Sequence, residues 1–272
     1  MTDQTAGMSS GIDKPFRIGL VLSGGSARGF AHLGVLRALE EYGIIPDVIS
    51  AVSAGAIVGV FYADGYCPGE IFDMFVEKKL FQLIRLNVNR KGFLKPSGIE
   101  ELMNTFLRAK TFPDLKIPLY ITASDMNRGK PVYFHDGDLR KCILASSAIP
   151  ILFQPVMINN TMFLDGGLLD NLPVHPVLGR CRLIIGVSVN PNFEDYSLNR
   201  YLKLMERTFY LSLVSKIREH SRYCDIFIEP EEMKKFGLFE IKKAREMVDA
   251  GYKEARQILK KYTGLLASVK NG

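Results

Sequence analysis

The sequence predicts an α/β fold built on a mainly parallel sheet. Two apolar segments, residues 16–22 and residues 44–49, have the length and composition of buried strands. Between them, residues 30–43 place apolar side chains at helical spacing, and this segment ends at Gly43, a residue typical of helix ends. A strand, a helix and a second strand in this order form a βαβ unit, which requires parallel pairing and a right-handed crossover.

Length and composition indicate a globular protein with a sizeable core. The chain has 272 residues, of which 47% are hydrophobic and 24% are charged, which suits one large α/β domain. The net charge of +6 is modest, and the basic residues are spread over several segments. We therefore expect no nucleic-acid partner. A peripheral contact with an anionic membrane surface stays open, beside the simpler interpretation of solvated helix faces.

Residues 1–14 are polar, and they lack the positively charged segment followed by an apolar segment that marks a signal peptide. We expect them to form a disordered leader before a single domain over residues 15–272. No apolar run is long enough to span a membrane. The cysteines are far apart and form no CxxC motif, which favours free thiols in a reducing compartment: Cys67, Cys142, Cys181 and Cys224. These features predict a cytoplasmic protein.

Small residues separate the second strand from an apolar helix over residues 56–62. The pentapeptide from Ala51 to Gly55 approximates the G-x-S-x-G elbow, in which a sharp strand-to-helix turn exposes a nucleophilic serine. Ser53 is the candidate nucleophile, and Ala51 stands where the elbow usually has glycine. A small-residue turn without chemistry remains an alternative for this stretch alone.

The glycine-rich turn over residues 24–29 has two interpretations. It approximates the G-x-G-x-x-G phosphate loop, with Asp47 near the position of a ribose-binding acid, but Ser26 replaces the middle glycine. Alternatively, its free backbone N–H groups hold an oxyanion. Parallel strands bring this turn and the elbow to the same sheet edge, which favours the second interpretation. Arg28 fits either a structural tie for the loop or a contact with an acidic ligand.

The remaining segments continue the alternation of helices and strands. Helices are predicted over residues 68–80, 97–109, 138–147, 174–178, 198–222 and 238–262. Strands are predicted over residues 117–123, 131–134, 156–158, 161–164, 183–189 and 224–228. Residues 81–95 mix apolar and basic side chains, as in a lid, a lipid contact or a core-facing excursion.

A third motif follows the predicted hairpin at residues 156–164. Asp165 ends its second strand and precedes Gly166 and Gly167, so the carboxyl group lies on a turn that other groups can approach closely. An ordinary Asp-Gly turn is the alternative. Asn171 stands before a Leu-Pro pair and fits a loop clamp or a helix cap.

Taken together and in this order, the three motifs resemble those of the patatin-like phospholipase family of serine acyl hydrolases. The resemblance covers residues 16–190, beyond which lies a helical part over residues 197–265. It implies a three-layer α/β/α fold and a catalytic dyad of Ser53 and Asp165 without histidine, cofactor or metal. It also implies an oxyanion loop and supporting residues: Gly24, Gly25, Ser26, Ala27, Arg28 and Gly29 in the loop, and Ala51, Ala54, Gly55, Gly166, Gly167 and Asn171 as support.

The resemblance implies a lipid or lysolipid ester as the substrate, hydrolysed through an acyl-enzyme. The chain departs from the family pattern at Ser26 and Ala51, and neither change removes a reacting group. Three alternatives stay open: a non-catalytic binding module on the same fold, a dinucleotide-binding oxidoreductase, and a triad completed by His175.

Overall fold

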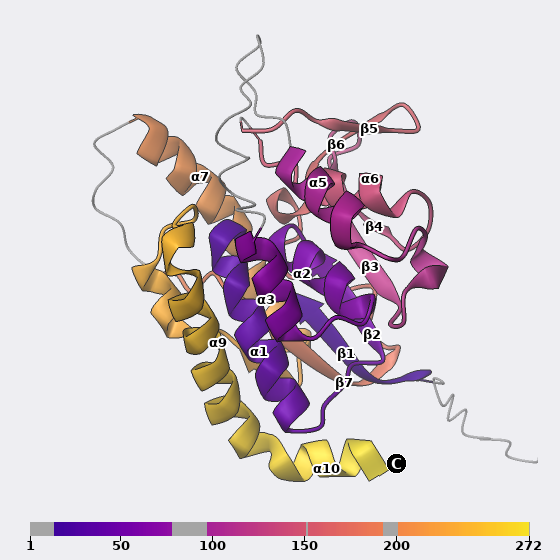
Figure 1. Cartoon of the computed structure of the whole chain (residues 1–272), viewed down its shortest axis with the longest axis vertical. Helices are drawn as coiled ribbons and strands as arrows, with labels where there is room; N and C mark the ends of the chain where they lie inside the picture. Colours follow the sequence, from indigo (N-terminus) through magenta and orange to yellow (C-terminus); the bar gives the residue numbers. More distant parts are fainter. Residues whose placement is uncertain (1–13, 78–96, 151, 193–200, 272) are drawn as a thin grey trace, which may run out of the picture.

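The computed structural model describes residues 14–77, 97–150, 152–192 and 201–271 (Figure 1). The predicted leader, apart from Lys14, lies outside the described residues, and so does the segment 81–95. The predicted α/β fold is confirmed. In the described part of the chain, eight strands form one mixed sheet in the order β5-β6-β3-β2-β1-β7-β8, with β4 paired to β3. Their bounds are β1 Phe16–Leu22, β2 Val48–Val52, β3 Leu119–Asp125, β4 Lys130–Phe134, β5 Val156–Ile158, β6 Thr161–Asp165, β7 Cys181–Val187 and β8 Ile226–Ile228.

The centre of the sheet is parallel. Strands β3, β2, β1, β7 and β8 pair in parallel, whereas β4 and β6 run antiparallel to β3 and β5 runs antiparallel to β6. The register places Leu22, the last residue of β1, beside Ala51 of β2. The turns that follow these two strands therefore lie at the same edge, as the predicted βαβ unit requires.

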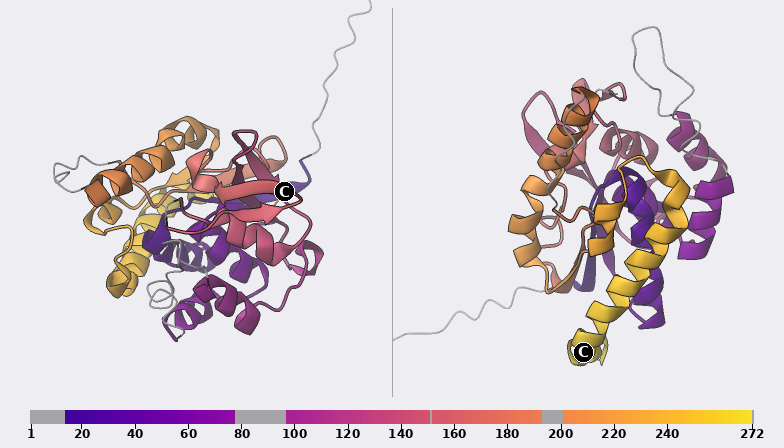
Figure 2. Two further views of the ribbon diagram at one scale, coloured as in Figure 1. Left: turned by 90° about the horizontal axis from the view of Figure 1, so that it is seen from above. Right: turned by 90° about the vertical axis from the view of Figure 1, so that its left-hand side faces the viewer.

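Both faces of the sheet are covered, because the central strands are apolar on both sides. Along β1, Leu20 and Leu22 pack into the larger core, while Val21 packs into the smaller core on the other face. Figure 2 shows α7 and α8 on one side of the sheet and α1 and α3 on the other. The helix bounds are α1 Phe30–Glu41, α2 Ala54–Ala63, α3 Pro68–Glu77, α5 Ser97–Phe106, α6 Leu139–Ser146, α7 Tyr201–Ser215, α8 Ile217–His220, α9 Ala244–Leu259 and α10 Thr263–Asn271.

Two local predictions were wrong. The strand predicted over residues 44–49 begins only at Val48, because Pro46 has no amide to donate and Ile45 is 62% exposed. It continues to Val52, because Ser50 and Ala51 pair with Val21 and Leu22. The short helix predicted over residues 174–178 is a turn, in which Val177 and Leu178 both donate to the carbonyl of Val174.

Candidate active site

Ser53 lies at the turn between β2 and α2. Its backbone angles are φ 53° and ψ −124°, a strained combination for a residue with a Cβ that costs on the order of 1–3 kcal/mol. Gly55 allows this turn to close, since a Cβ there would lie 2.5 Å from the carbonyl oxygen of Ser23. The strand, strained turn and helix form the arrangement that presents an elbow serine.

Ala51 is accommodated in place of the usual elbow glycine. It is fully buried in β2, and a Cβ built on Gly59 of α2 would lie 3.5 Å from the Ala51 Cβ. The extra methyl group therefore packs opposite a glycine, which leaves room for it.

The hydroxyl of Ser53 points at the carboxyl group of Asp165. Ser53 Oγ donates a hydrogen bond of 2.6 Å to Asp165 Oδ2, across 112 positions of the chain. Both residues are buried, with 5% and 1% of their surface exposed. The amide of Ser53 donates to Ser146 Oγ at 2.8 Å, which fixes the elbow against α6.

Asp165 ends β6 and is held from several directions. Its Oδ1 accepts from the amide of Gly167 at 2.8 Å, and its own amide donates to the carbonyl of Ala148 at 2.9 Å. Ser124 Oγ donates to its carbonyl oxygen at 2.8 Å. A Cβ at Gly166 would lie 2.3 Å from the carbonyl oxygen of Thr122, so the turn requires glycine there.

Burial raises the pKa of the Asp165 carboxyl from its ordinary value of 3.8 to about 7, while the hydrogen bonds from Ser53 and Gly167 act in the opposite direction. The loss of solvation dominates because, among the described residues, the carboxylate accepts from two donors, a hydroxyl and an amide, and both are neutral. A base with a pKa near 7 is suited to accept a proton from a serine hydroxyl at neutral pH.

The loop over residues 24–29 lies beside the elbow. A Cβ built on Gly24 would be 3.0 Å from the Ser53 Cβ, and one built on Gly29 would be 2.6 Å from the Ala54 Cβ. The amide of Gly24 donates to Asn171 Oδ1 at 3.0 Å, and its carbonyl accepts from Asn190 Nδ2 at 2.6 Å. Asn171 is therefore a clamp on this loop and not a helix cap.

The next two amides of the loop are available for an anion. The amides of Gly25 and Ser26 donate to none of the residues that the structure describes, whereas the Ala27 amide donates to the carbonyl of Leu238 at 2.8 Å. Ser26 has φ 50°, in the left-handed region that glycine adopts without strain. The serine therefore occupies the backbone conformation that a glycine would have there.

Arg28 ties the loop to the protein interior. Its side chain is 2% exposed, donates from Nε and Nη2 to the carbonyl of Phe236, and stacks 5.1 Å from the centre of the Tyr210 ring. These contacts favour the interpretation of Arg28 as a structural tie for the loop.

Two alternatives lose support. Asp47 accepts from the amides of Arg17 and Ile18 and from the Arg17 guanidinium. These contacts hold it at the amino end of β1, away from the edge where a ribose would lie. His175 contacts Asp170, with 3.9 Å between Nδ1 and Oδ2, and no hydrogen bond in the described part of the chain joins it to Ser53 or Asp165.

Several supporting residues carry no sequence signal. Ser146 accepts from the elbow amide, and Asn190 and Ser124 hold the loop and the Asp165 backbone. His32 is fully buried and lies 2.8 Å from the carbonyl oxygen of Ser23, and its burial lowers its pKa to about 4. Only the folded arrangement shows that these side chains surround the two turns.

An apolar pocket adjoins the elbow and the loop. Ser26 and Ala54 border it, and its walls come from Phe30 and Ile57 and from Phe75 of α3. Among the helices in the described residues, none combines the length and apolar character needed to cross a bilayer.

The profile of the patatin-like phospholipase family matches residues 20–178. An uncharacterised NTE family protein of Mycobacterium tuberculosis is 31% identical over 210 residues, which are 72% of this chain and 58% of that protein. Lysophospholipase nte1 of Aspergillus fumigatus is 32% identical over 174 residues, 60% of this chain and 11% of that protein. The structure of VipD from Legionella pneumophila has a TM-score of 0.56 at 17% identity, over 91% of this chain and 67% of that one. The chain thus spans less than two thirds of these curated relatives, and the likeness to VipD concerns the fold.

Proposed function

This chain belongs to the patatin-like phospholipase family, and on that premise we propose that it hydrolyses carboxylic esters of lipids through Ser53 and Asp165. The observation that carries the proposal is the 2.6 Å hydrogen bond between Ser53 Oγ and Asp165 Oδ2, beside the amides of Gly25 and Ser26, which donate to none of the described residues. A nucleophile, its base and an anion hole are the groups that acyl transfer requires.

The proposed reaction has two halves. Asp165 takes the hydroxyl proton while Ser53 Oγ bonds to the ester carbonyl carbon, and the amides of Gly25 and Ser26 stabilise the resulting oxyanion. The tetrahedral intermediate then releases the alcohol, which leaves with the proton from Asp165. In the second half, Asp165 takes a proton from a water molecule while the water oxygen bonds to the acyl carbon. The fatty acid is then released, and the proton returns from Asp165 to Ser53 Oγ.

The substrate class follows from the pocket and the relatives. The pocket beside the elbow is small, but its walls from Phe30, Ile57 and Phe75 are apolar, which favours an apolar group next to Ser53. Relatives are named lysophospholipases, which supports a phospholipid or lysophospholipid ester. The free thiols of all four cysteines support a cytoplasmic location, from which the enzyme would reach lipid at the membrane surface.

The test combines turnover with active-site labelling. We expect the protein to hydrolyse p-nitrophenyl acyl esters and to react with a fluorophosphonate at Ser53, as located by mass spectrometry of the labelled peptide. Ser53→Ala should lose the label and about 10⁴-fold or more in kcat, because the nucleophile is absent. Ser268→Ala, which changes an exposed serine of α10, is the matched control and should keep both.

A folded wild-type protein that neither turns over esters nor takes the label would contradict the proposal. The non-catalytic binding module would then become the better explanation of this fold. Full activity in Ser53→Ala would instead show that another residue is the nucleophile.

A further inference from the structure

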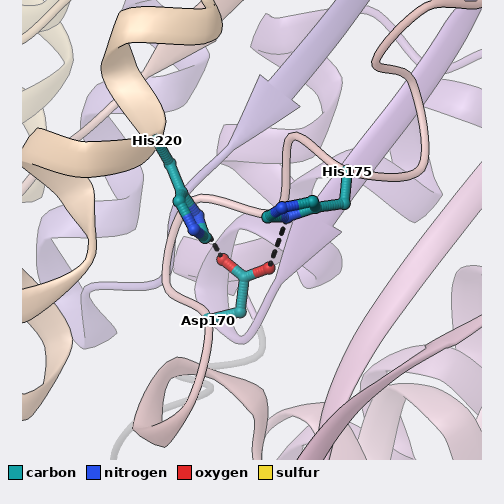
Figure 3. A group of neighbouring side chains, drawn as sticks. All are labelled: Asp170, His175 and His220. Carbon is teal, nitrogen blue, oxygen red and sulfur yellow. Dashed lines mark hydrogen bonds and ion pairs between the residues drawn. The ribbon is translucent and has the colours of Figure 1, made fainter.

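Three side chains outside the Ser53–Asp165 pair converge from separate segments. Figure 3 shows the rings of His175, from the turn after Pro173, and His220, from the end of α8, directed at the carboxylate of Asp170. His220 Nδ1 lies 3.0 Å from Asp170 Oδ1, and His175 Nδ1 lies 3.9 Å from Asp170 Oδ2. One nitrogen or oxygen of each residue lies within 4.8 Å of the others.

Two imidazoles and one carboxylate form a donor set typical of zinc and related divalent transition metals. In a tetrahedral site with bonds of about 2.0–2.1 Å, neighbouring ligand atoms are about 3.3 Å apart. The two separations from the carboxylate, 3.0 Å from Asp170 Oδ1 and 3.9 Å from Asp170 Oδ2, lie on either side of that value, and the three ligand atoms lie within 4.8 Å of one another. To bind one ion the side chains would therefore have to move by about 1–2 Å, and the exposed ring of His175 has the freedom to do so.

Burial divides the three ligands into an inner pair and an outer one. The side chains of Asp170 and His220 are 2% and 7% exposed, whereas that of His175 is 49% exposed. The inner pair is fixed by its surroundings, and His175 leaves one side open to solvent. An ion could therefore reach the site from the side of His175.

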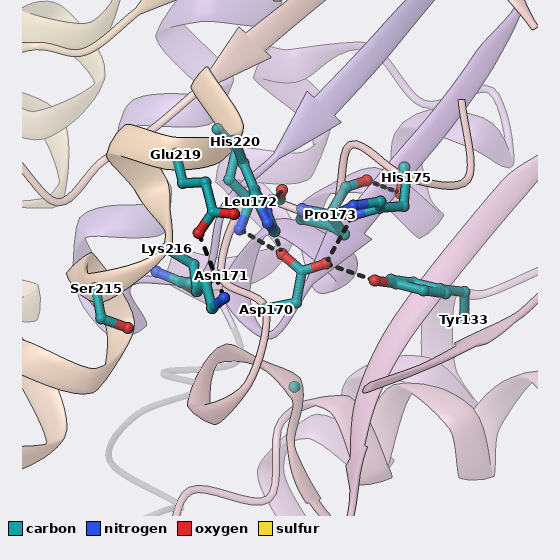
Figure 4. Close-up of polar contacts among 12 residues, drawn as sticks. Tyr133, Asp170, Asn171, Leu172, Pro173, His175, Ser215, Lys216, Glu219 and His220 are labelled. Carbon is teal, nitrogen blue, oxygen red and sulfur yellow. Dashed lines mark hydrogen bonds and ion pairs between the residues drawn. The ribbon is translucent and has the colours of Figure 1, made fainter. Parts of the chain in front are cut away.

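The carboxylate is oriented by further hydrogen bonds, as ligands of metal sites usually are. Tyr133 of β4 donates from its hydroxyl to Asp170 Oδ2 at 2.7 Å (Figure 4), and the Leu172 amide donates to Oδ1 at 3.3 Å. The Leu172 carbonyl oxygen lies 3.0 Å from His220 Nδ1 and adds another oxygen to the site. A cation would take the place of the proton that His220 shares with Asp170, and this proton would be released.

We propose that Asp170, His175 and His220 bind one divalent transition-metal ion of the zinc class. The site is independent of the proposed esterase chemistry, since it uses neither Ser53 nor Asp165. It also revises the expectation of no metal, which followed from the family resemblance. A bound ion ties the loop that follows Asp165 to α8.

Isothermal titration of untagged, chelator-treated protein with Zn²⁺ tests the site. We expect one ion per chain. The affinity should fall at least tenfold in His175→Ala, and because the ring of His175 is exposed, its removal should leave the fold intact. Tyr133→Phe should weaken binding by about 10-fold, because it removes a hydrogen bond that orients a ligand. The matched control is His135→Ala, which removes an exposed histidine outside the cluster and should leave the affinity unchanged.

A second readout is the melting temperature. At the same Zn²⁺ concentration, the rise should be equal in the wild type and in His135→Ala and smaller in His175→Ala, because stabilisation by a ligand falls as its affinity falls. The proposal is overturned if Zn²⁺ does not bind, or if it binds equally well to His175→Ala and the wild type. Ester turnover is not needed for either readout, so loss of the esterase proposal would leave this test intact.

Discussion

Asp165 and Asp170 are buried aspartates five positions apart on one loop, and their surroundings are opposite. Asp165 accepts from one hydroxyl and one amide, and burial raises its pKa to about 7. Asp170 accepts from the Tyr133 hydroxyl, the Leu172 amide and the His220 ring. The pKa of His220 is raised, chiefly by its hydrogen bond to Asp170.

Backbone strain divides the two regions in the same way. Four described residues other than glycine have positive φ. Two of them, Ser26 and Ser53, lie in the loop and the elbow next to Asp165, a region we call the Asp165 side, and the other two form the β5–β6 turn. The Asp165 side therefore combines strain with an under-solvated carboxyl group, as expected where reactivity is selected. The Asp170 side has satisfied hydrogen bonds, as expected of a tie or a ligand site. The partners of a carboxylate, more than its burial, decide what it can do.

The same substitution at both positions tests this contrast most strongly. Asp165→Asn should lower kcat on p-nitrophenyl esters by about 10²–10⁴-fold, because it removes the proposed general base while keeping the shape of the side chain. Asp170→Asn should reduce turnover far less and instead lower the free energy of unfolding by about 1–3 kcal/mol, because it weakens hydrogen bonds to His220 and Tyr133. Steady-state kinetics and urea unfolding on the two variants measure both quantities.

The contrast fails if the two variants lose turnover to the same degree while both stay folded. The loop would then act as one unit, with Asp170 as important to the reaction as Asp165. A loss of stability in Asp165→Asn larger than that in Asp170→Asn would also contradict it.

The second effect is a pH dependence of stability. Because the folded-state pKa of Asp165 is about 7 and its ordinary value is 3.8, the folded protein binds more protons between about pH 4 and pH 7. The stabilising contribution is present below pH 4 and is lost as the pH rises through 7. Relative to Asp165→Asn, the wild type should therefore lose up to about 4 kcal/mol of unfolding free energy between pH 4 and pH 8.

Urea unfolding of both proteins across this pH range measures the difference. Ser268→Ala, which changes an exposed serine and leaves Asp165 intact, is the matched control and should keep the decline seen in the wild type. If the unfolding free energies of the wild type and Asp165→Asn change in parallel with pH, the carboxyl group of Asp165 has its ordinary pKa in the folded protein and the prediction is wrong.

Local patterns predicted the elements that lie along a single stretch of chain. The apolar run of β1, the turn at residues 24–29 and the elbow at Ser53 depend on neighbours in sequence, so composition and spacing indicated them. The parallel pairing of β1 with β2 then brought the two turns to one edge. The failed helix at residues 174–178 shows the limit of this approach, because Val174 and Val177 instead pack from a turn into the smaller core.

Contacts between distant segments could not be predicted in the same way. Ser146 reaches the elbow from 93 positions away, and Asn171 reaches Gly24 from 147 positions away. His220 meets Asp170 only because α8 packs on the face of the sheet opposite α1. Such side chains have ordinary sequence surroundings, so their roles depend on packing that no local pattern contains.

The smallest effect concerns the strain at Ser26. Glycine adopts φ 50° without a penalty, so Ser26→Gly should raise the free energy of unfolding by up to about 1 kcal/mol while keeping the loop amides in place. The matched control is Ser221→Gly, at a residue with φ −60°, where glycine should instead lower stability by about 0.5–1 kcal/mol. Opposite signs in urea unfolding would establish that the backbone at Ser26 stores strain that the backbone at Ser221 does not. If Ser26→Gly and Ser221→Gly instead lower the free energy of unfolding equally, the Ser26 side chain stabilises the loop by more than its backbone strain costs.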